Sequence, residues 1–571
     1  MASRSNASAG GQWSSARWTA AAGAAAALLT VAAYLPSFTG GFYLDDLPNI
    51  IEADALHWNQ VGWAEIVAVV QDAFLVSRPV ANLSFALNHR VHGLEPFGFH
   101  LVNLLIHLCV AASLGWAAFL IAAHGRPAAE YARGRLAGLL VATLFALHPV
   151  NVQTVTYIVQ RMTSLATLFS LLAFACYLTA RRAAGPGEQS RRWMFVPAAM
   201  AAALACGSKE IALMLPAVVV AYELCFHRES WLARFAALRG AGIRSRIGFA
   251  AGVAGALALA WWIQDAVGLA ERIRWDETLI GRDFSGRVRA LTEARVGFFY
   301  LSLAIWPSAA RLALEHQFAL SSGWLAPWTT AASAVGWGII AAGALQVARR
   351  WPRFGFPILA FLLLNVIESL PISLEIVFEH RMYLPMAFLL LGLAALLHDL
   401  PRSGRHIAAP LVVVLVFGMA HATYSRNLIW SERLTLLRDN AAKAPGKYRA
   451  LYNYGAELIA EREFREAIDV LERALAANPA SFRVRTHLGT ANVALGRRDA
   501  AITHYMRALR DPSPRPYAAY NLGTLLDQEG RYDDAEVVFR HYLSIAPPEL
   551  AEATAQVRRR LRHGAASAGP K

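Results

Sequence analysis

Polar residues that could do chemistry stand at the ends of long apolar segments. Two adjacent carboxylates, Asp45 and Asp46, follow the first of these segments within Gly41-Phe-Tyr-Leu-Asp-Asp-Leu. A carboxylate can take a proton from a hydroxyl group or stabilise an oxocarbenium-like transition state. The cationic and imidazole candidates at later segment ends are Arg78, His148, Arg161, Lys209, His380 and Arg381, and the further acids are Glu210, Glu315 and Glu379. Such cations suit a substrate that carries a phosphate group.

The composition predicts an integral membrane protein. Of 571 residues, 56% are hydrophobic and 16% are charged, and the mean hydropathy is +0.36. The net charge is +14, but most basic residues stand between long apolar runs, which is typical of membrane topology and not of nucleic-acid binding. The four cysteines have neither a disulfide pattern nor metal-ligand spacing. We therefore expect membrane lipids as partners, no nucleic acid and no metal site, although carboxylates that converge in space could still form one.

The apolar runs predict a polytopic bundle of about eleven helices over residues 18–430. A span takes about 20 apolar residues. Candidate spans start near Trp18, His100, Leu136, Met162, Trp193, Lys209, Ile247, Trp324, Phe354, Tyr383 and Ile407. The two around Gly207 are short enough to be one broken helix, and 296–306 is expected to be re-entrant or interfacial.

Arginine-rich connections orient this bundle, because cytoplasmic loops are enriched in Lys and Arg. With the tail 1–17 in the cytoplasm, these connections fall on the cytoplasmic side and the candidate site residues fall on the outer side. Three simpler interpretations remain open. The acid pair could cap a helix, Arg161 and Lys209 could reach the lipid headgroups, and Arg78 could hold its loop instead of a phosphate.

The C-terminal part is expected to be a soluble helical repeat domain. After a linker helix at 431–447, residues 448–549 repeat with a period of 34, which places Gly455, Gly489 and Gly523 at equivalent positions, and 550–571 form a helix and basic tail. The pattern resembles the tetratricopeptide repeat, in which paired helices stack into a concave surface. Such a surface would bind a protein or peptide, or it could serve as a structural cap alone.

Glycosyl transfer from a polyprenyl phosphate accounts for this combination of residues. The acceptor hydroxyl needs a carboxylate base, and the leaving lipid phosphate needs Arg, Lys or His, for which the six candidates above are assigned as phosphate ligands and Glu210, Glu315 and Glu379 as supporting acids. No Gly-rich phosphate loop indicates a nucleotide-sugar site. The donor would therefore be the lipid-linked sugar itself, and no other cofactor is expected.

Several ordered motifs resemble the transmembrane and tetratricopeptide-repeat family of protein O-mannosyltransferases, within the GT-C superfamily. These motifs lie at 42–46, 78–85, 100–107, 147–161, 208–210, 300–307, 379–385 and 426–430. The resemblance implies an all-α GT-C core in which Asp45 and Asp46 act as or position the base. It also implies a polyprenyl-phosphate mannose donor and repeats that face acceptor proteins outside the cytoplasm. One departure is that His380 stands between Glu379 and Arg381.

The resulting expectation is an enzyme that transfers a sugar, most simply mannose, to Ser or Thr hydroxyls of proteins. The composition, rich in Ala and Arg, suggests a bacterial inner-membrane protein with periplasmic repeats. Two other functions remain open at this point. The enzyme could act on a lipid or polysaccharide acceptor, or the membrane part could anchor a non-catalytic repeat scaffold.

Overall fold

The computed structural model describes residues 3–71, 77–182, 189–240, 272–279, 284–510 and 515–567. Across these ranges the regular elements are helices and no strand is present, so the predicted all-α fold is confirmed. The chain divides into two compact units. Unit 1 comprises residues 1–314 and 318–433, and unit 2 comprises residues 315–317 and 434–571.

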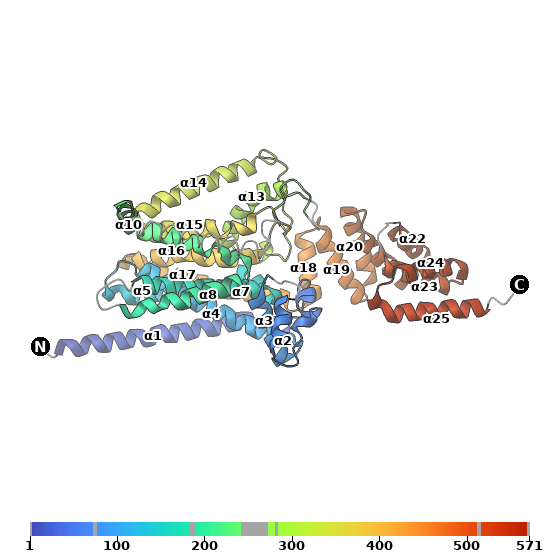
Figure 1. The fold of residues 1–571 in the computed structure, drawn as a ribbon, viewed down its shortest axis with the longest axis horizontal. Coiled ribbons are helices and arrows are strands. Elements are labelled where there is room, and N and C mark those ends of the chain that lie inside the picture. Colours follow the sequence, from blue (N-terminus) through green and yellow to red (C-terminus); the bar gives the residue numbers. More distant parts are fainter. Residues whose placement is uncertain are drawn as a thin grey trace. The chain divides into compact units, whose positions relative to one another are not determined.

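Unit 1 is a bundle of apolar helices (Figure 1). Six segments are long and apolar enough to cross a membrane: Arg17–Thr39, Pro96–Ala122, Ile158–Arg182, Thr329–Arg350, Glu379–Asp399 and Arg402–Trp430. Their principal helices are α1 (Ser3–Tyr34), α4 (Pro96–Ala122), α7 (Arg161–Arg182), α14 (Thr329–Arg350), α16 (Tyr383–Asp399) and α17 (Arg402–Trp430). The protein is therefore a membrane protein.

The described residues contain fewer full spans than the eleven expected from the sequence. A seventh span would combine Ala128–Ala146, which includes α5 (Tyr131–Ala146), with Pro149–Thr156, and these segments meet at 54°. The helices α8 (Phe195–Cys206) and α9 (Leu215–Phe226) are separate and short, and α15 (Pro352–Leu364) has 13 residues, about 20 Å of helix. The expected span near Ile247 lies outside the described residues.

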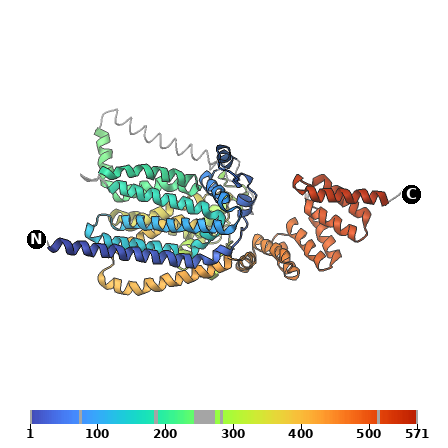
Figure 2. The same ribbon diagram turned by 90° about the horizontal axis from the view of Figure 1, so that it is seen from below.

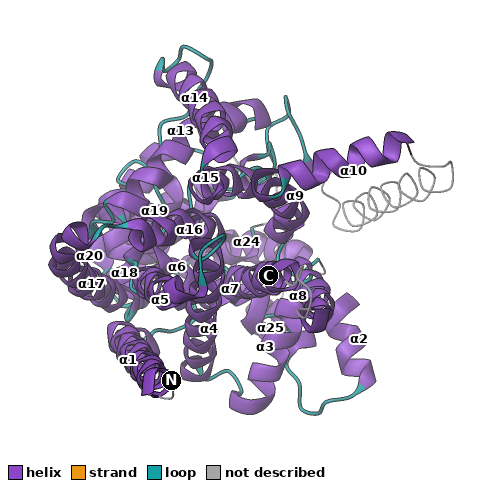
Figure 3. Ribbon diagram, turned by 90° about the vertical axis from the view of Figure 1, so that its left-hand side faces the viewer, coloured by secondary structure: helices purple, strands orange, loops and turns teal. Residues whose placement is uncertain are grey.

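Close backbone approach holds the centre of unit 1 together. Seen along the bundle, α4, α5, α7 and α16 group together while α1 and α14 lie at the edge (Figure 3). A Cβ atom at Gly138 of α5 would lie 2.4 Å from the carbonyl oxygen of Gly115 in α4, so only glycine allows this contact. The tight crossing explains why small residues occupy the apolar face between these two helices.

The candidate residues come from connections at one end of this bundle (Figure 2). There α1 ends, α7 and α16 begin, and three short helices lie between longer ones: η8 (Glu210–Met214), η10 (Ile367–Ser369) and η11 (Glu379–Met382). The connection after α1 contains η2 (Leu47–Ile51), α2 (Trp63–Gln71) and α3 (Pro79–His92). The helix α13 (Gly286–Ile305) also reaches this region and is not among the candidate spans.

Unit 2 consists of helix pairs with a linker helix before them and a last helix after them. The linker is α18 (Arg433–Lys443), and the pairs are α19 (Tyr448–Ala460) with α20 (Phe464–Ala477), α21 (Phe482–Ala494) with α22 (Arg498–Ala508), and α23 (Pro516–Gln528) with α24 (Tyr532–Ile545). The last helix is α25 (Ala551–Ser567). A Cβ atom would lie 2.6 Å from Leu471 at Gly455, 2.4 Å from Tyr505 at Gly489 and 2.6 Å from Phe539 at Gly523. The 34-residue glycine period thus marks the crossing of each pair.

Candidate active site

The second acid of the pair, Asp46, is a buried structural residue. Its side chain is fully buried, and its two carboxylate oxygens accept hydrogen bonds from the backbone N–H groups of Tyr43 (2.8 Å) and Val159 (2.7 Å). Burial raises the pKa of Asp46 to about 8, although both hydrogen bonds act in the opposite direction. The residue therefore fastens the loop after α1 to the start of α7.

The first acid, Asp45, has the opposite environment. The residue is exposed, and its backbone N–H donates to the Tyr157 hydroxyl at 2.8 Å. The preceding Leu44 has φ of +43°, a left-handed conformation that turns the chain between Tyr43 and the acid pair. Because the backbone is held on both sides, Asp45 is presented to solvent from a fixed loop.

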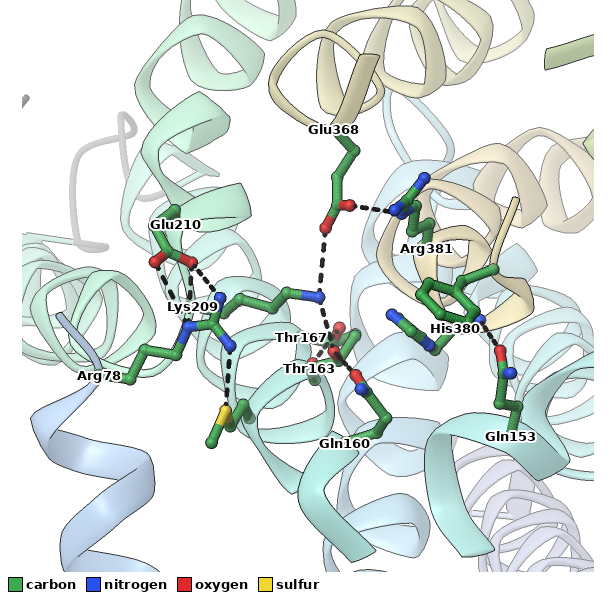
Figure 4. Close-up of polar contacts among 12 residues, drawn as sticks. Arg78, Gln153, Gln160, Thr163, Thr167, Lys209, Glu210, Glu368, His380 and Arg381 are labelled. Atoms are coloured by element: carbon green, nitrogen blue, oxygen red, sulfur yellow. Dashed lines mark hydrogen bonds and ion pairs between the residues drawn. The ribbon is translucent and has the colours of Figure 1, made fainter. Parts of the chain in front are cut away.

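A buried network of cations and carboxylates is centred on Lys209 and Glu368 (Figure 4). Lys209 Nζ lies 3.2 Å from Glu368 Oε1 and donates to Thr163 Oγ1 at 3.1 Å. The other oxygen of Glu368 lies 2.9 Å from Nε of Arg381. Burial raises the pKa of Glu368, but Lys209 and Arg381 outweigh it and lower that pKa to about 2. Glu368 is thus an anion held between two cations.

A second group of charges stands beside this network. Arg78 pairs with Glu210 at 2.9 Å, and Arg272 approaches the same carboxylate at 3.7 Å. Ser77 Oγ also donates to Glu210 at 2.9 Å. Although burial raises the pKa of Glu210, Arg78 holds it below its usual value. The side chains of Arg78 and Arg272 are 19% and 51% exposed, so these cations are the ones that a solvent-borne anion meets first.

Glu368, Arg289 and Glu293 belong to this network but were not among the candidate site residues named from the sequence. Glu293 Oε1 lies 2.8 Å from Arg289 and 3.8 Å from Arg381, and Arg289 also donates to the carbonyl oxygen of Glu368 at 2.7 Å. Burial raises the pKa of Glu293 to about 7. The i, i+4 spacing of Arg289 and Glu293 indicates an ion pair within α13, but it does not indicate the contact with Arg381.

Positive charge exceeds negative charge across the two groups. Five cations, which are Arg78, Lys209, Arg272, Arg289 and Arg381, share three carboxylates, those of Glu210, Glu293 and Glu368. The excess among these residues is two positive charges, of which a monoanionic phosphodiester would offset one and a dianionic phosphate monoester would offset both.

One short stretch of chain joins the acid loop to the cation network. The Tyr157 hydroxyl accepts the Asp45 amide, and the Val159 amide donates to Asp46. Only a few residues later, Thr163 accepts from Lys209 and donates to Gln160 Oε1 at 2.9 Å. The segment 157–163, which leads into the first turn of α7, therefore contacts both the acid pair and Lys209.

Two expected phosphate ligands, Arg161 and His148, are engaged by other groups of the protein. Arg161 is fully buried, and its three nitrogens donate to Asn103 Oδ1, Asn88 Oδ1 and the carbonyl oxygens of Ser84 and Phe99. His148 has Nε2 at 3.0 Å from the Ala304 carbonyl oxygen, and its Nδ1 accepts from the Val150 amide. These contacts use four of the five N–H groups of Arg161 and both ring nitrogens of His148, so both side chains join separate segments of unit 1.

The remaining expected residues divide between the network and other contacts. His380 is buried, its ring Nδ1 has no hydrogen bond among the described residues, and Lys209, Arg381 and Arg78 act on it electrostatically. Glu379 is buried and accepts from the Ala313 amide at 2.6 Å, which holds a loop. Glu315 belongs to unit 2, where it pairs with Arg449 at 2.6 Å, and its role as a supporting acid stays a prediction.

The described residues contain no group of three His, Cys, Asp or Glu side chains that could hold a metal ion. The carboxylates of the network are each engaged by cations, as their distances above show.

Comparison with known proteins shows which family this chain resembles. Protein O-mannosyl-transferase TMTC2 of Homo sapiens is 33% identical over 153 residues, which is 26% of this chain and 17% of the human protein. Protein O-mannosyl-transferase Tmtc3 of Drosophila melanogaster is 32% identical over 163 residues, again 26% of this chain and 17% of the relative. The chain resembles the TMTC O-mannosyltransferases. Each match spans less than a quarter of the relative's own length.

The repeat domain is matched independently. Two tetratricopeptide repeat family models cover residues 458–512 and 486–549. Protein O-mannosyl-transferase TMTC4 of Homo sapiens is also similar, at 29% identity over 169 residues, 27% of this chain and 22% of that protein. The tetratricopeptide repeats expected from the 34-residue period are thereby confirmed.

Proposed function

We propose that the protein is a membrane glycosyltransferase that transfers a sugar, mannose in the simplest case, from a polyprenyl phosphate to Ser or Thr hydroxyls of proteins. The observation that carries this proposal is that the segment 157–163, which leads into α7, contacts the Asp45 backbone amide through Tyr157 and contacts Lys209 through Thr163. This short segment links the loop of the solvent-facing Asp45 to the cation network. The names of the similar proteins support the same reaction class.

In this reaction the carboxylate and the cations have separate tasks. Asp45 accepts the proton of the acceptor hydroxyl while the hydroxyl oxygen bonds to the anomeric carbon of the sugar. The bond between that carbon and the phosphate oxygen breaks, and its electron pair stays on the lipid phosphate. Arg78 and Arg272 are accessible enough to bind that phosphate. The buried cations Lys209 and Arg381 add positive electrostatic potential without direct contact.

Asp46 serves as a positioning residue in the same proposal. Its carboxylate accepts two backbone N–H groups and has no exposed surface, so it does not reach an acceptor. Its hydrogen bonds fix the turn from which Asp45 projects. Of the two adjacent acids, we therefore propose Asp45 as the base.

The topology proposed with this function keeps residues 1–17 in the cytoplasm and the catalytic end of the bundle at the outer face of a bacterial inner membrane. An odd number of crossings then places the repeats in the periplasm, where they bind acceptor proteins. Cysteine accessibility tests this arrangement: a Cys at Asp54 would react with a membrane-impermeant reagent in whole cells, and a Cys at Arg402 would not.

Donor and acceptor specificity provide the functional test. Purified protein is mixed with polyprenyl phosphates that carry labelled mannose, glucose or galactose, together with Ser/Thr-rich peptides or the same peptides with Ala in place of Ser and Thr. We expect label only in hydroxyl-containing peptides and with one sugar preferred. Label in an added lipid or polysaccharide, with none in any peptide, would contradict a protein acceptor.

A further inference from the structure

A groove in unit 2 lies between α25 and the turn that precedes it. It has a volume of about 540 Å³ and is lined by Ala546, Pro547, Pro548, Ala551, Thr554, Ala555, Arg558, Arg559 and Arg562. The residues from α25 follow the spacing i, i+3, i+4, i+7, i+8 and i+11, which is one continuous stripe of a helix. The stripe is small and apolar at its start and cationic at its end.

The opposite face of α25 holds the helix in place, so the groove face is not needed for packing. Val557 is 1% exposed in the core of unit 2, and Arg560 pairs with Asp527 of α23 at 3.0 Å. Tyr520 donates to Gln556 Oε1 at 2.9 Å. These contacts fix the stripe toward the groove.

The three groove arginines are exposed and have no ion pair among the described residues. Arg558, Arg559 and Arg562 stand close in sequence on the same stripe, whereas their neighbour Arg560 is paired with a carboxylate. Three guanidinium groups that share one concave surface repel each other and attract an anionic partner. The groove therefore has a positive charge that no carboxylate in the described part of unit 2 pairs with.

We infer that this groove binds an acidic, extended polypeptide segment whose acids contact the arginines and whose small apolar residues contact Ala551, Ala555 and the Pro547–Pro548 turn. The stripe from Ala551 to Arg562 is roughly 16 Å long at 1.5 Å per residue, which matches about five residues of an extended chain. The preceding helix pair at 516–549 contains six acidic residues and two arginines. The acidic helix pair would repel an anionic membrane surface, and a flat surface cannot enter a groove. An acidic peptide is therefore the better match for this groove.

This inference deepens the proposed function, since the bound segment would belong to an acceptor protein. Its test needs no sugar donor. If binding holds and transfer is absent, only the proposed function fails, and if transfer holds without binding, only this inference fails.

Fluorescence anisotropy with the full chain in neutral detergent measures the binding. The probe is a labelled Ser-Ala-Val-Glu-Glu-Asp-Glu peptide, and the comparison peptide has Gln and Asn in place of its acids. We expect Arg558→Gln with Arg559→Gln and Arg562→Gln to raise the Kd of the acidic peptide at least tenfold. A control with Arg473→Gln, Arg497→Gln and Arg507→Gln removes the same charge from exposed positions outside the groove and should change the Kd less than twofold.

A second variant tests the apolar end. Ala551→Trp fills that end, seven residues before the first groove arginine, and the Kd is expected to rise at least threefold. Equal weakening by both triple variants, equal affinity for the neutral peptide, or displacement of the peptide by vesicles of anionic phospholipid would each overturn the inference.

Discussion

The carboxylate of Asp46 accepts a hydrogen bond from the backbone N–H of Val159 at 2.7 Å, across 113 residues of sequence. A second bond from the Tyr43 amide occupies the other oxygen. Asp45, one residue earlier, is exposed. Adjacent acids thus have different roles in the account proposed here: the second builds the loop, and the first acts from it.

Stability should separate the two acids. Asp46→Ala leaves the amides of Tyr43 and Val159 buried without an acceptor, and we expect a loss of about 2–4 kcal/mol in the free energy of unfolding. Asp45→Ala removes an exposed side chain and should change stability by no more than about 0.5 kcal/mol. Thermal unfolding in detergent measures both, and equal losses would contradict the assignment.

The cation network should respond most strongly to removal of its central carboxylate. Glu368→Gln leaves Lys209 and Arg381 buried without their shared anion, at an expected cost of about 3–5 kcal/mol. Lys209→Met should cost less, because Glu368 keeps Arg381. Denaturation of the two variants in the same detergent tests the order, and a larger effect of Lys209→Met would show that Glu368 is not the centre.

Acid should weaken this network over a defined range of pH. The pKa of Glu368 is about 2 in the folded protein, below its ordinary value of 4.5, so the folded state binds the proton less tightly than the unfolded state does. The stabilisation is present above pH 4.5 and is lost as the pH falls toward 2. The melting temperature of the wild type should therefore fall more steeply between pH 4.5 and 2 than that of Glu368→Gln. Parallel curves would contradict this linkage.

The repeat glycines should tolerate no side chain. At Gly489 a Cβ atom would lie 2.4 Å from the Tyr505 ring, so Gly489→Ala should cost roughly 1–3 kcal/mol and increase hydrogen exchange in α21 and α22. The matched control is Gly343→Ala in α14, where no atom lies within 4 Å of the added Cβ. Unchanged exchange in the Gly489 variant would mean that the helix pair adjusts without cost.

Sequence patterns predicted the elements better than the contacts of single residues. A 34-residue period identifies the helix pairs because each crossing needs a small residue, and long apolar runs identify spans such as Pro96–Ala122. Among the described residues fewer helices than expected are long enough to cross a membrane. One reason is that the chain leaves the α-helix between Cys206 and Leu215, around the Gly207 position where the short apolar runs already indicated a possible break.

Arg161 illustrates why part of the site could not be predicted. From the sequence, an arginine at the start of a helix is predicted to bind a phosphate or a lipid headgroup. In the structure, Arg161 instead donates to the neutral oxygens of Asn88, Asn103 and nearby carbonyl groups. Those partners come from segments more than 50 residues away. Only the three-dimensional arrangement distinguishes such a buried arginine from Arg78, which faces solvent beside Glu210.

The most direct test of the central claim is sugar transfer by Asp45→Asn. Purified wild type, Asp45→Asn and the control Asp54→Asn are incubated with radiolabelled polyprenyl-phosphate mannose and a Ser/Thr-rich peptide. Asp54 is an exposed acid of the same connection, so its substitution makes the same change of charge outside the site. The account predicts label in the peptide with the wild type and the control, and at least about a hundredfold less with Asp45→Asn at unchanged melting temperature. Full transfer by Asp45→Asn would contradict it.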